Sequence, residues 1–288
     1  MQNILFHDID GCLNTIDGIA LPFAPELYLQ SQKSVLHQLG EALDNSLVDM
    51  MVLNTGRSLE AALGIASAIN SRKLKYVIAE HGAIGYSLPT SSRLDLAEHA
   101  RSLPHLGDVY TTVSKIPVLM NWYQNEGAGL LAREIDHLVD ISPKLANLTL
   151  KIPPGINGDK MLRVIRQLIE IHSPLADEML VYHHSKSDGY VDVMAEVNKG
   201  SGVEIICHLE SHQPMRTYAI GNGLNDLPMF ECVDLCICPA NADKILIEFC
   251  NKNKGYVSGH DYIEATLNML GNMDSFVART SRRKLLWR

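Results

Sequence analysis

Four short polar segments carry the side chains of this sequence that could take part in chemistry. They lie beside apolar runs of strand length or at the start of helical patterns: residues 8–11 (DIDG), 55–57 (TGR), 198–200 (NKG) and 221–226 (GNGLND). Together they contain carboxylates, a hydroxyl and an ammonium group, which are groups that move protons and hold charged ligands. The sequence therefore predicts a polar site built from four separate parts of the chain.

Taken singly, the four segments have ordinary structural explanations. DIDG also fits a turn with solvated carboxylates. The pair Gly221 and Gly223 is similar to the start of a dinucleotide loop but lacks the third glycine, and Asp226 could serve as a helix cap. Thr55 and Lys199 could be a loop hydroxyl and a surface amine. Their combination, each beside a strand end or a helix start, favours a functional site.

The elements around these segments are typical of a parallel α/β sheet. Short apolar runs alternate with helical patterns, which is the signature of βαβ units. We expect strands at residues 3–7, 47–54, 76–79, 217–220 and 235–238. Ligand sites in open α/β sheets lie beyond the carboxyl ends of the strands. The four polar segments should therefore meet at one edge of the sheet.

Three helices can be placed from their apolar faces and start signals. Residues 35–43 carry a buried face that connects the first two strands, and a second helix follows Ser58 with an apolar stripe over residues 59–69. Ser201 and Glu204 form an S-x-x-E pattern, which predicts a capping box at the start of a later helix.

The regular alternation stops near residue 85 and resumes near residue 195. The intervening segment mixes prolines and glycines with fragments of strand and helix patterns, which predicts an inserted second domain. We expect a core formed by residues 1–84 and 195–288, and an inserted α+β domain formed by residues 85–194.

The charge and hydropathy of the chain argue against several classes of partner. The 288 residues include 33 acidic and 25 basic side chains, and the resulting formal charge of −8 repels a phosphate backbone. There is no run of 18 apolar residues and no basic leader at the start. We expect a cytoplasmic protein that binds neither nucleic acid nor membrane, with a solvated basic tail over residues 279–288.

The six cysteines fit no disulfide framework. Cys232, Cys236 and Cys238 lie close together in the sequence, but C-x3-C-x-C is not a usual zinc spacing. Cys236 and Cys238 also fall within an apolar run of strand length. We therefore expect buried thiols rather than a metal site.

The four motifs resemble those of the haloacid dehalogenase superfamily of phosphohydrolases. They are residues 4–11 (ILFHDIDG), 52–57 (VLNTGR), 197–200 (VNKG) and 220–226 (IGNGLND). With the insertion between the second and third motifs and AEHGA before it, the layout is similar to subfamily IIB, which includes Cof-type and sucrose phosphatases. The resemblance covers the core and implies an α/β fold, a Rossmann-like parallel-sheet core with an inserted α+β cap.

The resemblance implies a role for each motif residue. Asp8 would be the nucleophile that forms an aspartyl phosphate, and Asp10 would be the general acid and base. The phosphoryl group would be bound by Thr55, Gly56, Arg57 and Lys199. Among these, Thr55 and Lys199 would also stabilise the charge that develops on the phosphoryl oxygens.

Mg²⁺ is the cofactor that the resemblance implies, because carboxylates alone would repel an anionic substrate. Its protein ligands would be Asp8, Asp10 through its main-chain oxygen, Asp226 and Asn222. The family usually has an aspartate where Asn222 stands. An amide oxygen can still coordinate a cation but lacks the negative charge, so we expect weaker Mg²⁺ binding. Cys12, where the family often has threonine, is a smaller difference.

The expected substrate is a small phosphorylated metabolite, with a sugar phosphate favoured because GNGLND resembles the motif of Cof-like and sucrose-phosphatase proteins. Candidate contacts for a sugar or carboxylate are Arg57, His183, His184 and Lys186, although exposed polar loops explain the last three equally well. Two alternatives stay open. One is a non-catalytic protein that binds a phosphorylated ligand, in which Asn222 would be the first sign that catalysis has been lost. The other is a phosphomutase that uses the same nucleophile.

Overall fold

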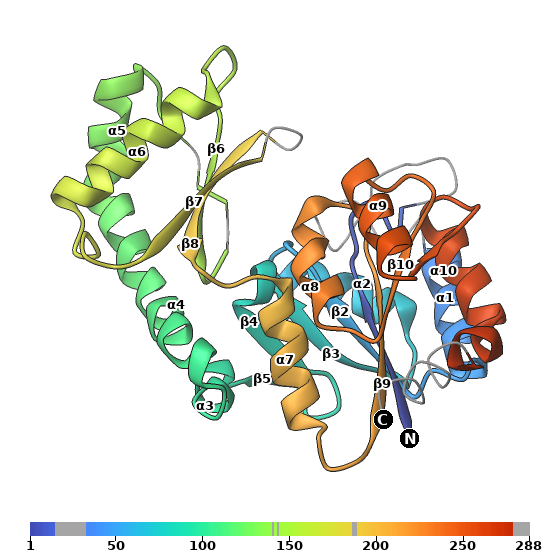
Figure 1. Ribbon diagram of the computed structural model, residues 1–288. Helices are drawn as coiled ribbons and strands as arrows, with labels where there is room; N and C mark the ends of the chain where they lie inside the picture. The colour runs from blue at the N-terminus through green and yellow to red at the C-terminus, as the bar shows by residue number, and fades with distance from the viewer. Residues whose placement is uncertain (15–32, 140, 143, 186–188, 279–288) are drawn as a thin grey trace. The chain divides into compact units, whose positions relative to one another are not determined.

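The computed structural model describes residues 1–14, 33–139, 141–142, 144–185 and 189–278. The chain forms two compact units (Figure 1): Met1–Asp95 with Asn198–Arg288, and Leu96–Val197. Lys186 and the basic tail over residues 279–288 lie outside the described residues.

An eight-stranded sheet forms the centre of the first unit. Its order is β11-β10-β9-β1-β2-β3-β4-β5, in which β11 to β3 are parallel neighbours and β4 and β5 are antiparallel. The predicted parallel α/β sheet is confirmed. The strands are β1 (Gln2–His7), β2 (Met50–Asn54), β3 (Leu74–Ala79), β4 (Ile84–Ser87), β5 (Ser92–Leu94), β9 (Met215–Ile220), β10 (Leu235–Cys238) and β11 (Tyr256–Val257).

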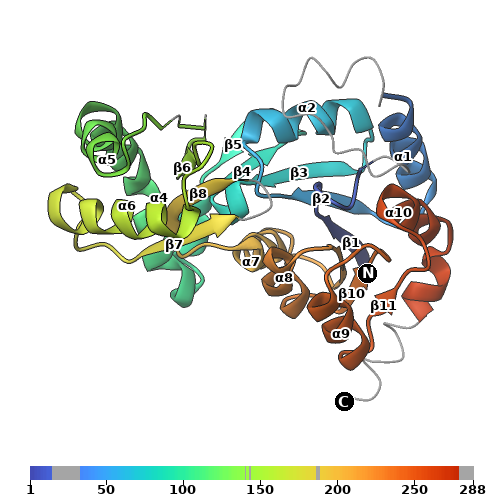
Figure 2. The same ribbon diagram turned by 90° about the horizontal axis from the view of Figure 1, so that it is seen from above.

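Helices cover both faces of this sheet. Figure 2 shows α1 (Lys33–Asn45), α2 (Leu59–Ile69) and α10 (Tyr262–Gly271) on one side. The other side carries α7 (Lys199–Leu209), α8 (Leu227–Glu231) and α9 (Lys244–Lys252). The first unit therefore has three layers, which is the doubly wound arrangement that the alternating sequence pattern indicates.

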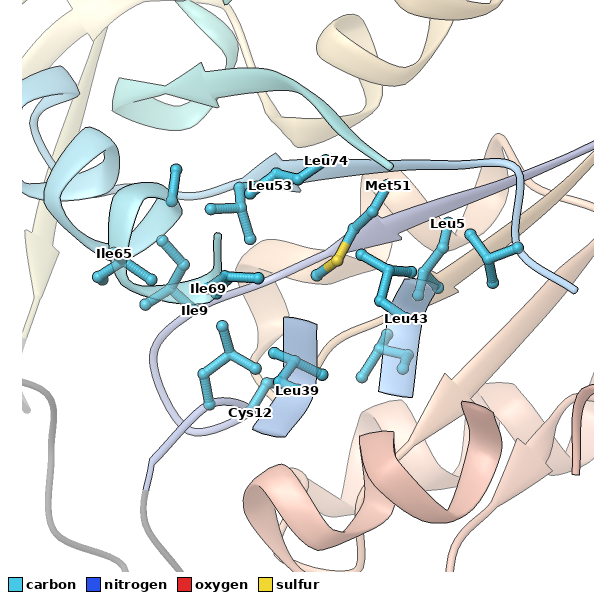
Figure 3. Packing of buried hydrophobic residues seen from close by; sticks show 14 of the residues in the cluster. Leu5, Ile9, Cys12, Leu39, Leu43, Met51, Leu53, Ile65, Ile69 and Leu74 are labelled. Carbon is cyan, nitrogen blue, oxygen red and sulfur yellow. The ribbon is translucent and has the colours of Figure 1, made fainter. Parts of the chain in front are cut away.

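The packing between the sheet and its helices follows from the alternation of side chains along each strand. Met51 and Leu53 are two residues apart on β2, so both point to the same face. Figure 3 shows them packed with Leu5 of β1 against Leu39 of α1 and Ile69 of α2. All five side chains are fully buried. This cluster fixes the strands whose ends carry the polar segments.

Several boundaries differ from the sequence-based expectation, and β1, β3 and β9 each begin one or two residues earlier than predicted. β2 begins at Met50 rather than at residue 47, because Leu47 and Asp49 instead bind the side chain and the N–H group of Asn3. The first unit extends to Asp95 rather than to residue 84, because β4 and β5 continue its sheet as antiparallel strands. The start of α2 is as predicted, since Ser58 Oγ accepts a hydrogen bond from the N–H of Ala61.

The second unit is a three-stranded antiparallel sheet with helices. The strand order is β6-β8-β7. The elements are α3 (Leu96–Ala100), α4 (Pro104–Trp122), a π-helical segment (Tyr123–Gly127), α5 (Ala128–Ile135), β6 (Asn147–Lys151), α6 (Gly158–His172), β7 (Leu180–Ser185) and β8 (Tyr190–Ala195). Its core joins alternate strand residues such as Leu148 and Val193 to Ile116 of α4 and Ile165 of α6. Among the described residues of the chain, every helix is too short or too polar to cross a bilayer.

A tight contact between Gly40 of α1 and Ile69 of α2 gives a test of the fold. A Cβ atom at Gly40 would lie 1.9 Å from the main-chain oxygen of Ile69, so Gly40→Ala must push the two helices apart. We expect a loss of about 1–3 kcal/mol in the free energy of unfolding, measured by denaturant titration. Gly129→Ala in α5 is the control, because nothing lies within 4 Å of its Cβ position. A neutral Gly40→Ala would contradict this packing.

Candidate active site

The ends of three neighbouring strands bring the polar segments together. β1 lies between β2 and β9, and His7 is paired with Leu53 on one side and with Ile220 on the other. The N–H group of Asp8 then donates to the Ile220 carbonyl at 3.0 Å. Asp8 and Thr55 therefore follow adjacent strand ends, at the edge of the sheet where the sequence predicted a site.

Lys199 connects the first, third and fourth motifs. Its Nζ lies 2.5 Å from Oδ1 of Asp8 and 2.6 Å from Oδ1 of Asp226. The exposed fractions of Lys199, Asp8 and Asp226 are 1%, 3% and 0%. One ammonium group thus lies between two buried carboxylates, and this contact joins residues from three distant parts of the chain.

Asp226 is held on both sides. Its Oδ1 accepts from Lys199, and its Oδ2 accepts from the N–H groups of Asn222 and Gly223 at 2.9 and 3.0 Å. Both carboxylate oxygens therefore have partners within the protein. Asp226 acts in this structure as the anchor of Lys199 and of the loop that follows β9.

Burial and their charged neighbours shift the pKa values of both Asp8 and Lys199. Burial and the nearby Asp226 carboxylate raise the pKa of Asp8 to about 8, against the opposing effect of Lys199. Burial disfavours the charged form of Lys199, but the two carboxylates outweigh it and raise the pKa of the ammonium group. Lys199 therefore stays charged at neutral pH, while Asp8 is more easily protonated than an ordinary aspartate.

Arg57 is paired with Asp10. Its Nη2 lies 2.6 Å from Oδ1 of Asp10, and its Nε lies 2.9 Å from Oδ2. Such a two-point contact fixes the plane of a carboxylate. The Arg57 side chain is buried, whereas that of Asp10 is 49% exposed. The structure thus places Arg57 as a support for Asp10, where the sequence suggested a substrate contact.

Thr55 and Gly56 lie under the loop that follows β3. Thr55 is fully buried, and its Oγ1 accepts from the N–H group of Arg57 at 3.2 Å. A Cβ atom at Gly56 would lie 2.4 Å from Cε1 of His81, so only glycine leaves room for that imidazole ring. His81 is not among the site residues that the sequence predicted. The sequence signal was Gly82, which follows His81 in AEHGA. Both residues have positive φ, a conformation that glycine adopts readily.

The helix that carries Lys199 starts earlier than predicted. Asn198, not Ser201, is the N-cap: its side-chain oxygen accepts from the N–H groups of Gly200 and Ser201. Ser201 Oγ accepts in return from the Asn198 N–H. Both residue types cap helices well, and here the asparagine takes the position, so the predicted pairing of Ser201 with Glu204 is wrong. Lys199 consequently stands in the first turn of α7.

Asn222 packs against the loop that follows Asp8. A Cβ atom at Gly11 would lie 2.0 Å from Nδ2 of Asn222, and Gly11 has a φ of +73°. Both the close approach and the backbone conformation require glycine here. The Cys12 thiol lies 3.6 Å from Oδ1 of Asn222 as a weak donor. The fourth motif thus contacts the loop of the first.

Two further buried polar residues were hidden within apolar runs. Asn54, at the end of β2, donates through Nδ2 to the Lys199 carbonyl at 2.8 Å. His7, directly before Asp8, is fully buried, and burial lowers its pKa to about 4, so its ring is neutral at pH 7. The only sequence signal for either was its position next to a motif.

The candidate contacts in the inserted segment lie on a strand rather than in a loop. His183 and His184 belong to β7, and Nδ1 of His184 lies 2.7 Å from Oδ1 of Asp159. Cys236 and Cys238 are buried on β10, as expected. Within the described ranges, no three His, Cys, Asp or Glu side chains are grouped so that they could hold a metal ion.

The donor set at the strand ends still suits a hard cation in its chemistry. Mg²⁺ prefers oxygen ligands and keeps several waters, so a few protein donors suffice. The Asp8 carboxylate, the Asp10 main-chain oxygen and the Asn222 side-chain oxygen are donors of this kind. Asp226 is different, because its two oxygens accept hydrogen bonds from Lys199 and from two main-chain N–H groups, whereas Oδ1 of Asn222 accepts only weakly, from the Cys12 thiol. The residues fit Mg²⁺ with Asp226 supporting Lys199.

Several solved structures share this fold at low sequence identity. The protein 0175 of Thermoplasma acidophilum is 16% identical, with a TM-score of 0.60 over 95% of this chain and 99% of that one. The sucrose-phosphatase of Synechocystis, solved with sucrose and phosphate, is 16% identical, with a TM-score of 0.57 over 95% and 98%. A sugar phosphatase of subclass IIB is 15% identical, with a TM-score of 0.51 over 89% and 93%.

Sequence comparison adds a short stretch of similarity to one curated protein and a match to a family. The phosphoglycolate phosphatase of Haloarcula marismortui is 30% identical over 69 residues, which are 24% of this chain and 30% of that protein. The sequence profile of the haloacid dehalogenase-like hydrolases matches residues 6–258, a span that includes the DIDG, TGR, NKG and GNGLND segments. With Asp8, Lys199 and Asp226 at one point of a doubly wound sheet, the chain belongs to the haloacid dehalogenase-like hydrolase family.

Proposed function

We propose that the protein is a cytoplasmic, Mg²⁺-dependent phosphatase that hydrolyses a small phosphorylated metabolite through an aspartyl phosphate. The observation that carries the proposal is the position of Lys199 between Asp8 and Asp226, with Asp10 two residues further on. Attack on an anionic phosphoryl group needs a fixed nucleophile beside a fixed positive charge, and this arrangement supplies both.

Asp8 and Asp10 would divide the reaction into two steps. In the first step, a carboxylate oxygen of Asp8 bonds to phosphorus, the bond from phosphorus to the leaving oxygen breaks, and Asp10 donates a proton to that oxygen. In the second step, Asp10 takes a proton from water, the water oxygen bonds to phosphorus, and the bond between phosphorus and the Asp8 oxygen breaks. Inorganic phosphate leaves, and the carboxylate of Asp8 is restored.

The different surroundings of the two aspartates support these different roles. Asp8 is buried against Lys199, which limits the directions from which it can attack. Asp10 is about half exposed and is oriented by Arg57, so it can reach both the leaving group and water. Lys199 and Thr55 would hold the phosphoryl oxygens, with Asp226 keeping the lysine in place.

Mg²⁺ would supply the positive charge that offsets the three carboxylates when an anionic substrate enters. We assign the Asp8 carboxylate, the Asp10 main-chain oxygen and the Asn222 side-chain oxygen as its ligands. Asp226 would act on the cation only through water or through Lys199, because its own oxygens have protein partners.

A sugar phosphate is the substrate class that we propose. Two of the proteins with this fold are a sucrose-phosphatase and a sugar phosphatase. The phosphoglycolate phosphatase relative acts on another small phosphate ester, which favours a metabolite over a phosphoprotein. We further propose that the unit Leu96–Val197 is a cap that selects the substrate.

Phosphate release from a panel of sugar phosphates and p-nitrophenyl phosphate tests this function. We expect Mg²⁺-dependent release that is greatest with one or a few sugar phosphates. Formation of an isomeric phosphate without release would indicate a phosphomutase. If folded protein with ample Mg²⁺ releases nothing from any compound, the non-catalytic binding function replaces this proposal.

Asp8→Asn tests the nucleophile and its burial together. We expect kcat/KM to fall by roughly 10⁴-fold or more, because a neutral amide cannot form the aspartyl phosphate. Stability without divalent cations should also change. A carboxyl group whose pKa rises from 3.8 to about 8 on folding binds protons more tightly in the folded state, so it destabilises the wild type progressively as pH rises from 4 to 8.

The advantage in melting temperature of Asp8→Asn over the wild type should therefore grow between pH 5 and pH 8. Thermal unfolding in a chelator, followed at several pH values, measures this difference. Parallel pH profiles for the two proteins would show that the pKa of Asp8 is not raised in the folded state.

Arg57→Met separates two roles for the guanidinium group. If Arg57 orients Asp10, its loss should lower kcat by about 10–100-fold and leave KM within a few-fold, because the acid is misplaced while the phosphoryl contacts persist. The first-turnover release of p-nitrophenol from p-nitrophenyl phosphate, whose leaving group needs no proton, serves as the control and should show a smaller effect than steady-state turnover, because the second step still needs Asp10 as a base. A large rise in KM at unchanged kcat would instead identify Arg57 as a substrate ligand.

Asn222→Asp tests the proposed cation ligand. Adding a carboxylate should lower the Mg²⁺ concentration that gives half-maximal activity by about tenfold, which corresponds to roughly 1.4 kcal/mol. Asn225→Asp is a matched control, since it adds the same charge at an exposed position of the same loop. Unchanged Mg²⁺ dependence in Asn222→Asp, or an equal change in both variants, would remove Asn222 from the ligand set.

A further inference from the structure

A buried histidine connects the main chain of Asp8 to a distant helix. His7 is the last residue of β1 and lies directly before Asp8. Thr266 lies in the middle of α10, 259 residues further along the chain. Both residues are fully buried. Neither takes part in the proposed chemistry, so their contact needs another explanation.

The two ring nitrogens of His7 have different partners. Nδ1 is hydrogen-bonded to the main-chain carbonyl oxygen of Asp8, and Nε2 lies 2.8 Å from the hydroxyl oxygen of Thr266. A carbonyl oxygen can only accept, so Nδ1 must carry a hydrogen. Neither partner is charged, and burial of the ring disfavours an imidazolium. The ring is therefore neutral, Nε2 carries no hydrogen, and the Thr266 hydroxyl donates to it.

This chain of hydrogen bonds acts on the backbone that carries the nucleophile. The N–H group of Asp8 donates to the Ile220 carbonyl of β9 at 3.0 Å, and its carbonyl accepts from His7. Both peptide groups of Asp8 are thus held. The Asp8 side chain extends toward Lys199, and its Oδ1 lies 2.5 Å from Nζ of that lysine. The two peptide planes that meet at the Asp8 Cα atom together determine the direction in which its side chain leaves the main chain, so these hydrogen bonds fix that direction.

Helix α10 is well suited to hold such a contact. Ile263 and Met269 on either side of Thr266 are fully buried in the core that also contains Leu5 of β1. The N–H group of Ile263 approaches the carbonyl oxygen of Asn14 at 3.4 Å, on the far side of the nucleophile loop. The helix therefore contacts the chain on both sides of Asp8, at His7 before it and at Asn14 after it.

We propose that His7 and Thr266 are positioning residues: they form a relay from Thr266 through the Nδ1–H tautomer of His7 to the Asp8 carbonyl, and this relay sets the direction of nucleophilic attack. The proposal rests on the phosphatase function proposed above. The relay donates no proton to the substrate and remains unchanged during the reaction. It acts on catalysis only through the geometry of Asp8.

A matched pair of substitutions at Thr266 tests the relay without touching the proposed catalytic residues. Thr266→Val keeps the side-chain shape and removes the donor, whereas Thr266→Ser keeps the donor. We expect Thr266→Val to lower kcat by about 10–100-fold with KM within about twofold, and Thr266→Ser to retain most of the wild-type kcat. Melting temperatures of both variants show whether the fold is intact.

Nitrogen NMR of histidine-labelled wild-type protein supplies a second measurement that depends on neither activity nor a variant's folding. The His7 signals, assigned by comparison with His7→Gln, should show hydrogen on Nδ1 and none on Nε2. Hydrogen on Nε2, or wild-type kcat in Thr266→Val, would overturn the relay. In the second case the wild type would still release phosphate, so the phosphatase function would stand. A wild type that releases no phosphate would overturn both proposals.

Discussion

One ammonium group between two buried carboxylates is the interaction on which the site depends. A carboxylate removed from water without a partner costs several kcal/mol, so Asp8 and Asp226 can share this space only while Lys199 stays charged between them. The two carboxylates in turn favour the charged form of the buried lysine and raise its pKa. The three residues come from the position after β1, the start of α7 and the segment after β9, so a distortion of this edge of the sheet would separate the charges. The core fold and the charge arrangement therefore stabilise each other.

The second ion pair differs from the first in exposure, and this difference separates the roles of two aspartates that lie two residues apart. Asp8 is buried and held, through its carboxylate by Lys199 and through its peptide groups by Ile220 and His7. The Asp10 side chain is half exposed, and two contacts with Arg57 fix the plane of its carboxylate while leaving it accessible to water. A nucleophile benefits from a fixed direction, while a group that exchanges protons with water must remain accessible.

The sequence predicted the parts of this arrangement that are local. The strands that carry Asp8, Thr55 and the Gly221 loop were found because their apolar runs end at polar motifs. It could not predict which of Asn198 and Ser201 caps α7, since both residue types cap helices and the surrounding structure decides. β4 and β5 were missed because they are short and partly exposed. The pairing of Arg57 with Asp10, 47 residues apart, and of His7 with Thr266 arises only from tertiary packing.

Direct detection of phosphorylated Asp8 is the measurement that tests the central assignment most closely. Asp10→Asn should still react with p-nitrophenyl phosphate, whose leaving group needs no proton, but should lose the base that activates water for the second step. The protein would be quenched in acid after mixing, digested and examined by mass spectrometry. We predict one added phosphoryl group on the peptide that contains Asp8, and none in Asp8→Asn. Release of p-nitrophenol with no phosphoryl group on Asp8, or with one on another residue, would contradict the assignment.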